Sequence, residues 1–243
     1  IQMYKDKFKE HFIEIKLVIV EELENMEQYV KCNKVDFAIN RSRNHIMGEL
    51  LEQKGVRVFN SSSVTRIANN KGITYEFLKD VVPFLAVKYG NEIIESKIEN
   101  KGFEYPYVIK SCSGHGGSQV FLVNNRKEEE QAVKAMNGQE YVVQQCCSDL
   151  GRDVRVYIIG NKIIKAVLRT STESFKSNYS LGGKAQEYTL NNEEKAMVER
   201  IVDKLPLDYA GIDFTFHNGK AVFNEIEDAV GARMLYQVSD IDI

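Results

Sequence analysis

The stretch AGIDFTFHNGKAVFNEIED, residues 210–228, decides the fold of this chain. Its first half alternates apolar and polar side chains around Asp213, which is the period of a half-buried β-strand. The dipeptide Asn218-Gly219 is a preferred two-residue hairpin turn, and the residues after it predict a return strand. Asp213 stands about as far before the turn as Glu225 stands after it. The hairpin therefore predicts that these two carboxylates approach each other.

Three carboxylates on this hairpin indicate a cation site. Glu225 and Glu227 alternate with Ile226 and therefore share one face of the return strand, where they join Asp213. Carboxylates gathered on a rigid sheet repel one another unless a cation lies among them. Hard oxygen ligands of this kind suit Mg²⁺ or Mn²⁺. A solvated acidic face is the alternative, and this hairpin alone leaves both interpretations open.

A second hairpin is predicted by YPYVIKSCSGHGGSQVFLV, residues 105–123. Two short apolar strands flank a loop of small residues, and the first strand ends at Lys110. Glycines in such a loop let backbone N–H groups approach a phosphate chain closely, and a lysine adds a cation for the same phosphates. The pattern is not a Walker A loop, because no Gly-Lys-Ser/Thr ends it and no helix follows at once. A phosphate-binding loop and a flexible hairpin tip both remain open.

A third segment, YVVQQCCSDLGRDVRVYIIGNKIIKAVLRTS at 141–171, predicts a buried strand, a short break and a long hairpin that turns at Gly160-Asn161. Asp153 and Arg155 alternate with valines and therefore share the polar face of this hairpin. A polar, glycine-bearing loop follows, FKSNYSLGG at 175–183.

Taken in order, these segments resemble the ATP-grasp superfamily, and most closely its RimK-like carboxylate–amine ligases. The resemblance runs from about Asn69 to Asp242 and is densest over 107–233, through VIKSCSGHGGSQV, VVQQCCSDLGRDVRVYIIG, FKSNYSLGG, AGIDF and NEIED. It implies an α/β (α+β) chain with an ATP-grasp fold of two lobes, preceded by a small parallel-sheet domain. The implied boundaries are 1–69 for the pre-ATP-grasp domain and 70–243 for the ATP-grasp domain, with an ATP lobe at about 70–145 and a C-terminal catalytic lobe at about 146–243.

The resemblance also implies a role for each matched position. Gln145 and Cys146 would offer backbone groups to the adenine edge. The positions expected to bind ATP are Lys71, Lys110, Ser113, Gly116, Gly117, Ser118, Gln145, Cys146 and Asp153. Those expected to hold Mg²⁺ (or Mn²⁺) are Asp213, Glu225 and Glu227. Arg169 and Lys176 are expected to stabilise charge on the transferred phosphoryl group. Arg233 is expected to bind a carboxylate of the acceptor, or else to be an exposed helix arginine.

Three departures from the family pattern concern this site. Asparagine usually stands where this chain has Glu227, and arginine where it has Lys176. An added carboxylate should strengthen metal binding, whereas lysine loses the planar fork of arginine but keeps a point charge. The usual Ser-Pro-Gly is replaced by the segment 228–231, Asp-Ala-Val-Gly, so the acceptor is the least specified part of the prediction.

The implied function is an ATP-dependent, ADP-forming ligase that joins the carboxylate of an amino acid or peptide to an amine through an acyl phosphate. One alternative is an ATP-binding regulatory or scaffolding module with a degenerate ligase site. Another is a different ATP-grasp reaction such as carboxylation, which we rank lower because nothing in the sequence indicates biotin or bicarbonate handling.

Composition agrees with this interpretation. A hydrophobic content of 43% suffices for a core, and no apolar run approaches the roughly 18–20 residues of a membrane span. A net charge of −3 gives no reason to expect nucleic acid as a partner. The four cysteines form no CxxC pair, which favours reduced thiols in a cytoplasmic protein. A homo-oligomer is left open.

The N-terminal part predicts alternating strands and helices, and hence a small parallel sheet. The predicted strands are 13–20, 35–39 and 56–59, followed later by 84–89; the predicted helices are 45–54, one from about Ser63 with a serine cap, 72–80, 91–100, 128–136 and 192–204. Arg41-Ser42-Arg43 follows a strand end, where open α/β sheets bind ligands. These arginines either reach an anionic substrate or belong to a solvated loop.

Overall fold

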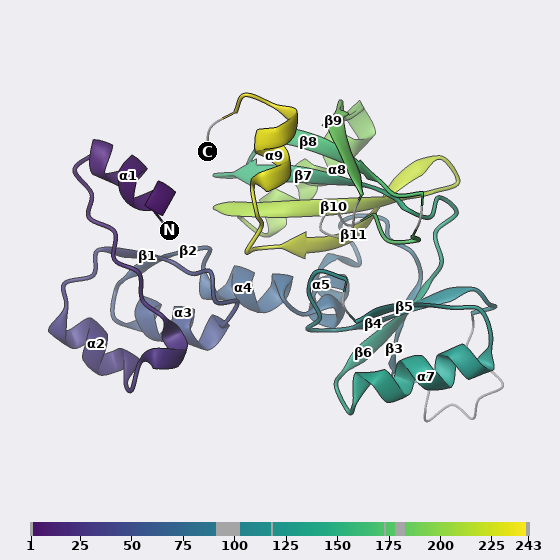
Figure 1. Ribbon diagram of the computed structural model, residues 1–243, viewed down its shortest axis with the longest axis horizontal. Coiled ribbons are helices and arrows are strands. Elements are labelled where there is room, and N and C mark those ends of the chain that lie inside the picture. Colours follow the sequence, from purple (N-terminus) through teal and green to yellow (C-terminus); the bar gives the residue numbers. More distant parts are fainter. Residues whose placement is uncertain (1, 91–102, 118, 173, 178–182, 242–243) are drawn as a thin grey trace.

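The computed structural model describes residues 2–90, 103–117, 119–172, 174–177 and 183–241 (Figure 1). Helices and strands alternate along the described chain, and the strands form one parallel and two antiparallel sheets. The predicted α/β (α+β) class is therefore confirmed. The predicted helix at 91–100 lies outside the described residues.

The N-terminal region contains a two-stranded parallel sheet joined by a helix, as predicted. Its elements are α1 (Gln2–Glu10), the 3-10 helix η1 (Val20–Glu22), α2 (Met26–Cys32), β1 (Phe37–Ile39), α3 (His45–Gln53) and β2 (Arg57–Phe59). The predicted strand at 13–20 is wrong, because residues 13–19 form neither a strand nor a helix. Ile13, Leu17 and Ile19 are 36%, 52% and 44% exposed, so this apolar stretch has no second layer against which to pair.

Two consecutive helices lead from this region into a four-stranded sheet. They are α4 (Ser62–Ala68) and α5 (Lys71–Leu78), and Ser61 caps the first by accepting a hydrogen bond from the Val64 N–H. The sheet has the order β3-β6-β4-β5 and is antiparallel. Its elements are β3 (Val87–Tyr89), β4 (Tyr107–Ser111), β5 (Val120–Val123), α7 (Arg126–Met136) and β6 (Tyr141–Gln145). Helix α7 covers one face of this sheet (Figure 1).

A five-stranded antiparallel sheet completes the chain, in the order β11-β10-β7-β8-β9. Its elements are β7 (Arg152–Ile159), β8 (Lys162–Thr170), β9 (Lys184–Tyr188), α8 (Asn192–Lys204), β10 (Tyr209–His217), β11 (Lys220–Glu227) and α9 (Arg233–Val238). Val154 and Val156 of β7 pack into the cluster that contains residues of α8, whereas Tyr157 of β7 and Val167 of β8 pack into the cluster that contains residues of α9. Alternate side chains of the strands therefore serve two cores, one on each face.

The turns explain why both long hairpins form. Asn218 and Gly219 have φ values of +51° and +74°, and Gly160 and Asn161 have +53° and +65°. Two successive left-handed residues are what a two-residue hairpin turn requires, and asparagine and glycine adopt them most readily. The β10–β11 register pairs Asp213 with Glu225, as predicted.

The largest apolar cluster joins the two antiparallel sheets. Tyr75 of α5 lies 5.0 Å from Phe84 and 6.1 Å from Phe223, measured between ring centroids. The Phe223 N–H also donates to Pro83 O at 2.9 Å. Burying each large side chain stabilises the fold by about 1.5–3 kcal/mol. The packing of these aromatic rings therefore holds the two sheets opposite each other. The polar side chains between them are positioned by that packing.

Candidate active site between the two sheets

Two adjoining cavities lie between the four-stranded and five-stranded sheets. The larger has a volume of about 270 Å³ and the smaller about 110 Å³. The residues that line both are Lys71, Gly114, Gly116, Arg169 and Glu225. A ligand with two parts could therefore extend from one cavity to the other along this shared wall.

Lysines reach the shared wall and the smaller cavity from three separate elements. Lys110 is the last residue but one of β4, which continues to Ser111, one residue beyond the predicted strand end. Lys110 is only 8% exposed and donates from Nζ to Asn224 Oδ1 at 2.8 Å. Burial lowers the pKa of Lys110 to about 8, although the negative charge of Glu225 opposes the change. Lys71 Nζ donates to Gly114 O at 2.7 Å, and Lys176 Nζ donates to Gly117 O at 2.6 Å.

The glycine loop between β4 and β5 needs its glycines for conformation. Gly116 and Gly117 have φ values of +62° and +76°, in the left-handed region that other residues seldom adopt. Both line the smaller cavity, and lysine ammonium groups bind the carbonyls of Gly114 and Gly117. Ser113 is exposed and lines neither cavity, and Ser118 lies outside the described residues.

The connection between the sheets borders the smaller cavity at one of the two expected positions. Gln145 lines this cavity, and its N–H donates to Ala86 O at 2.9 Å. Cys146 lines neither cavity, whereas the adjacent Cys147 lines the smaller one. Burial raises the pKa of the Cys146 thiol to about 11, which keeps it protonated near neutral pH.

A buried network of arginines and aspartates forms the wall made by the five-stranded sheet. Asp213 is completely buried and accepts hydrogen bonds from Arg155 Nε and Nη2, both at 2.8 Å, and from Arg169 Nη2 at 2.6 Å. Arg169 also holds Asp153 through Nε at 2.7 Å and Nη2 at 2.5 Å. Burial alone would raise the pKa of Asp213, but the two guanidinium groups outweigh it and lower that pKa to about 2.

The three expected metal ligands are each held by a cation, and Arg155 is shared by Asp213 and Glu227. Glu225 Oε2 lies 3.5 Å from Lys71 Nζ, and Glu227 Oε2 lies 2.7 Å from Arg155 Nη2. Within the described part of the chain, no three His, Cys, Asp or Glu side chains form a group that could hold a metal ion. The predicted hairpin is present, but its carboxylates do not converge on one point.

Arg155, Asn224 and His115 are among the polar residues of the site that sequence reasoning did not assign to it. Arg155 bridges Asp213 and Glu227, although its alternation with Asp153 had placed it only on a polar face. Asn224 lines the smaller cavity because β11 bulges opposite Asp213 and Phe214, which a simple alternation of residues cannot reveal. His115, at the tip of the glycine loop, lines the larger cavity.

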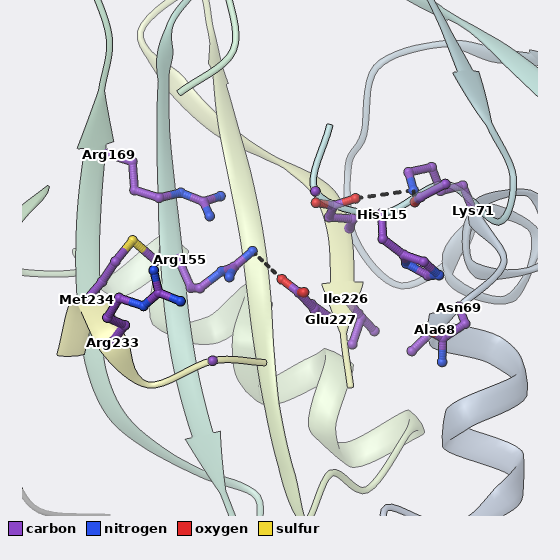
Figure 2. Close-up of a pocket in the computed structure, with 14 residues that line it drawn as sticks. Ala68, Asn69, Lys71, His115, Arg155, Arg169, Ile226, Glu227, Arg233 and Met234 are labelled. Carbon is purple, nitrogen blue, oxygen red and sulfur yellow. Dashed lines mark hydrogen bonds and ion pairs between the residues drawn. The ribbon is translucent and has the colours of Figure 1, made fainter. Parts of the chain in front are cut away.

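Figure 2 shows basic side chains on both sides of the larger cavity. Arg155, Arg169 and Arg233 approach from one side, whereas Lys71 and His115 approach from the other. Glu227 extends between them toward Arg155. Burial and the neighbouring positive charges lower the pKa of His115. The cavity therefore presents a predominantly positive lining, which favours an anionic ligand.

The loop Arg41-Ser42-Arg43 contacts the protein itself, which neither of the two sequence interpretations anticipated. Arg41 Nη2 donates to Ala229 O at 3.0 Å and to Val230 O at 2.9 Å. Arg43 Nη2 donates to Glu227 Oε1 at 3.3 Å. The loop thus binds the segment that directly follows β11.

Comparisons with known proteins agree with this architecture. The RimK-like ATP-grasp domain matches residues 48–243. An uncharacterized protein of Mycoplasma genitalium is 33% identical over 223 residues, which cover 91% of this chain and 75% of that protein. A probable alpha-L-glutamate ligase of Maridesulfovibrio salexigens is 26% identical over 230 residues, covering 93% of this chain and 67% of the relative.

Solved structures share the fold. The RimK domain ATP-grasp protein of Sphaerobacter thermophilus has a TM-score of 0.78 at 20% identity, over 97% of this chain and 89% of that one. The D-alanine–D-alanine ligase of Bacillus anthracis, solved with ATP, has a TM-score of 0.69 at 16% identity, over 86% of this chain and 74% of that one. The chain therefore belongs to the RimK-like ATP-grasp family, a family of ATP-binding ligases.

The resemblance given by the five sequence motifs is thus confirmed, and so is the ATP-grasp fold. Among the helices that the structure describes, none is both long enough and apolar enough to cross a membrane.

Proposed function

We propose that this protein is an ADP-forming ligase that activates the carboxylate of an amino acid or peptide with ATP and joins it to an amine. The observation that carries the proposal is the cluster of Lys71, Lys110 and Lys176 around one cavity. Two of them, Lys71 and Lys176, hold backbone carbonyls of the glycine loop. Phosphate oxygens are stronger acceptors for ammonium groups than neutral carbonyls, so ATP could replace these contacts.

In this proposal the smaller cavity binds the nucleotide. Lys110 and Lys71 hold the phosphate chain, and Gly116 and Gly117 lie over it. The connection would face adenine at Gln145, which lines this cavity, with Cys146 next to it in sequence; Asp153 also lines the cavity. Ser113 and Ser118 stand in the same loop in the sequence, and the proposal gives them no separate contact with the nucleotide.

The larger cavity would then hold the carboxylate and the amine. Arg169 lines both cavities and thus lies where a transferred phosphoryl group would pass from one to the other. Lys176 lines the smaller cavity, and Arg233 lines the larger one. Fixed positive charges stabilise the developing charge of the reaction without reorganising. Arg169 and Lys176 are therefore the proposed catalytic cations, and Arg233 the acceptor-binding one.

The proposed reaction has two displacements. A carboxylate oxygen of the substrate attacks the γ-phosphorus of ATP, and the bond from that phosphorus to ADP breaks. The amine nitrogen then attacks the acyl carbon, loses a proton, and releases phosphate that keeps the attacking carboxylate oxygen. Positioning and charge neutralisation account for catalysis of this kind, and no covalent enzyme nucleophile is needed.

A divalent cation, Mg²⁺ or Mn²⁺, is part of the proposal through Asp213 and Glu225, with Glu227 as the third predicted ligand. Carboxylate oxygens suit such ions chemically. However, arginines occupy Asp213 and Glu227, and only Glu225 faces a lysine at 3.5 Å. The arrangement as it stands does not fit a three-carboxylate site, so no step is assigned to the metal.

The proposal is tested by screening amino acids and short peptides, as carboxylates and as amines, for stimulation of ADP release. A true substrate pair should raise ADP release together with a product whose mass is the sum of the two substrates less water. ADP release that ignores every added carboxylate, without a coupled product, contradicts ligase activity.

One observation favours a second candidate. Arginines neutralise Asp213 and Glu227, as they would in an ATP-binding regulatory or scaffolding module with a degenerate ligase site. Such a module would bind ATP without releasing ADP. We place either activity in the cytoplasm, where ATP is abundant and where the free thiols of this chain stay reduced.

A further inference from the structure

Glu227 is held by two guanidinium groups from different parts of the chain. Its Oε2 lies 2.7 Å from Arg155 Nη2 on β7 in the five-stranded sheet. Its Oε1 accepts a hydrogen bond at 3.3 Å from Nη2 of Arg43, which lies between β1 and α3. Both carboxylate oxygens therefore already have cationic partners, and one partner lies in the loop that follows β1 of the N-terminal sheet.

The backbone around Arg43 is built to make this contact. Arg43 has a φ of +60°, in a left-handed region that residues other than glycine seldom adopt. Such conformations persist where surrounding contacts hold them, and two residues earlier Arg41 donates to the carbonyls of Ala229 and Val230. The same loop thus binds Glu227 and the backbone of Ala229 and Val230.

A second tie holds the same segment. Asn60 Nδ2 donates to Asp228 O at 3.2 Å and to Tyr209 O at 2.7 Å. The end of β11 is therefore fixed by residues that precede α4. Glu227 in turn contacts Arg155, which lines the larger cavity. A displacement of the N-terminal sheet would therefore also shift Arg155.

Electrostatics argues against a further cation at Glu227. Both of its carboxylate oxygens already lie against guanidinium groups, those of Arg43 and of Arg155, which Asp213 shares. A divalent ion on the same oxygens would face both guanidinium groups at a few ångströms, where like charges in a partly buried site repel strongly. Glu225 is paired with the ammonium group of Lys71 at the longer distance of 3.5 Å and so carries less of this penalty.

We propose that Arg43 and Glu227 form an ion pair between the N-terminal sheet and the five-stranded sheet, and that this pair makes Glu227 a counter-ion rather than a metal ligand. Arg43 is then a positioning residue that acts through Glu227 on Arg155. The inference rests on the proposed function only where nucleotide and metal are added. The ion pair itself can be tested without either.

The first experiment is a double-mutant cycle on the full chain in EDTA, with Arg43→Ala, Glu227→Gln and the double variant. If the side chains form one pair, each single change should lower Tm by roughly 2–4 °C, and the double variant should lose no more than the worse single one. The matched control is Arg57→Ala, which removes the ion pair of Arg57 with Asp208, also between the two sheets. Its shift should add to that of Glu227→Gln.

A double variant of Arg43 and Glu227 whose Tm shift equals the sum of the single shifts overturns the pair. This includes the case in which none of the three variants moves Tm. Both side chains are partly exposed, at 33% and 25%, so these variants should still fold.

The second experiment measures Mn²⁺ binding by electron paramagnetic resonance in the presence of ADP. Glu227→Gln should keep the Mn²⁺ affinity within about twofold, whereas Glu225→Gln should weaken it about tenfold or more. Equal losses in the two variants overturn the counter-ion role of Glu227. Normal Mn²⁺ binding in Glu225→Gln counts instead against the metal site of the proposed function, and the metal-free cycle still decides on the ion pair.

The positioning role of Arg43 has its own readout. With a substrate pair in hand, Arg43→Ala should lower kcat about tenfold while KM for ATP stays within about twofold, because the nucleotide-side lysines are untouched. Arg43→Lys should recover part of kcat, and Arg57→Ala should leave both values unchanged. A rise in KM for ATP with unchanged kcat overturns this role.

Discussion

The two cavities contain cations of different kinds and in different states. In the smaller cavity, lysine ammonium groups bind neutral oxygens, such as Asn224 Oδ1 and Gly117 O. In the larger cavity, arginines are paired with buried carboxylates, above all Asp213. A lysine bound to a neutral oxygen can exchange it for a phosphate at little cost. An arginine paired with a buried aspartate cannot leave without exposing an uncompensated charge.

This difference teaches that the two sides of the site serve the protein differently. We expect changes on the lysine side to weaken ligand binding while the fold survives. We expect changes on the arginine side to lower the stability of the fold as well. A lysine-side substitution that destabilises the fold, or an arginine-side substitution that leaves its stability unchanged, would contradict the comparison.

The largest effect is expected at the wall shared by both cavities. Glu225→Gln removes a charge that faces Lys71 and should reduce turnover by about 10²–10³-fold, while leaving the fold intact. Steady-state ADP release and circular dichroism would measure the two outcomes. Glu227→Asn is the matched comparison and should retain activity to within the about tenfold loss expected of Arg43→Ala. Wild-type turnover in Glu225→Gln would show that the charge at this wall is dispensable.

A large effect on stability is expected for Arg155→Ala. Asp213 would lose two hydrogen bonds and keep its charge in a completely buried position, which costs about 3–5 kcal/mol in the free energy of unfolding. Urea denaturation would measure this loss, with Arg233→Ala as an exposed control expected to change the unfolding free energy by less than about 0.5 kcal/mol. Equal stability of the two variants would remove the distinction between the cavities.

Lys110→Ala should act on binding rather than on folding. The loss of one charge-assisted hydrogen bond, worth about 1.5–3 kcal/mol, should weaken ATP binding by roughly 10-fold to 100-fold. Lys110→Arg keeps the positive charge but changes the shape of the charged group, so its affinity for ATP should lie between those of the wild type and Lys110→Ala. Isothermal titration with ATP would measure the affinities, and an unchanged titration for Lys110→Ala would limit this lysine to a structural role.

The smallest expected effect is on pH dependence. Since burial lowers the pKa of Lys110 to about 8, its side chain is charged below that pH and becomes neutral above it. Its contribution to ATP affinity should therefore be present near pH 7 and decline as the pH rises through about 8. Arginine stays charged throughout this range, so Lys110→Arg should flatten the decline. The same slope in wild type and variant would assign the pH dependence to another group.

Local pattern predicted most of the fold, because it depends on neighbours in sequence. The alternation around Asp213 and the turn at Asn218-Gly219 predicted the hairpin and its register. The stretch at 13–20 has a similar apolar pattern but failed as a strand, because a strand also needs a partner and a layer to pack against.

The side-chain pairing of the site depends on contacts between distant segments. The β7–β10 register aligns Arg155 with Asp213, and nothing near either residue in the sequence indicates that alignment. The bulge that exposes Asn224 to the cavity is likewise a property of two strands together. Family resemblance pointed to residues that line the cavities, such as Lys71, Lys110 and Glu225, but not to Arg155, nor to the cation that each carboxylate binds.

The central claim is that a carboxylate oxygen attacks the γ-phosphate of ATP. The most direct test uses the carboxylate substrate found by screening, labelled with ¹⁸O, and mass analysis of the phosphate released with its amine partner. Each phosphate released should carry one label from the carboxylate, in step with ADP, and hydroxylamine should replace the amine to give a hydroxamate. Unlabelled phosphate, released at the same rate without the carboxylate, would contradict the account.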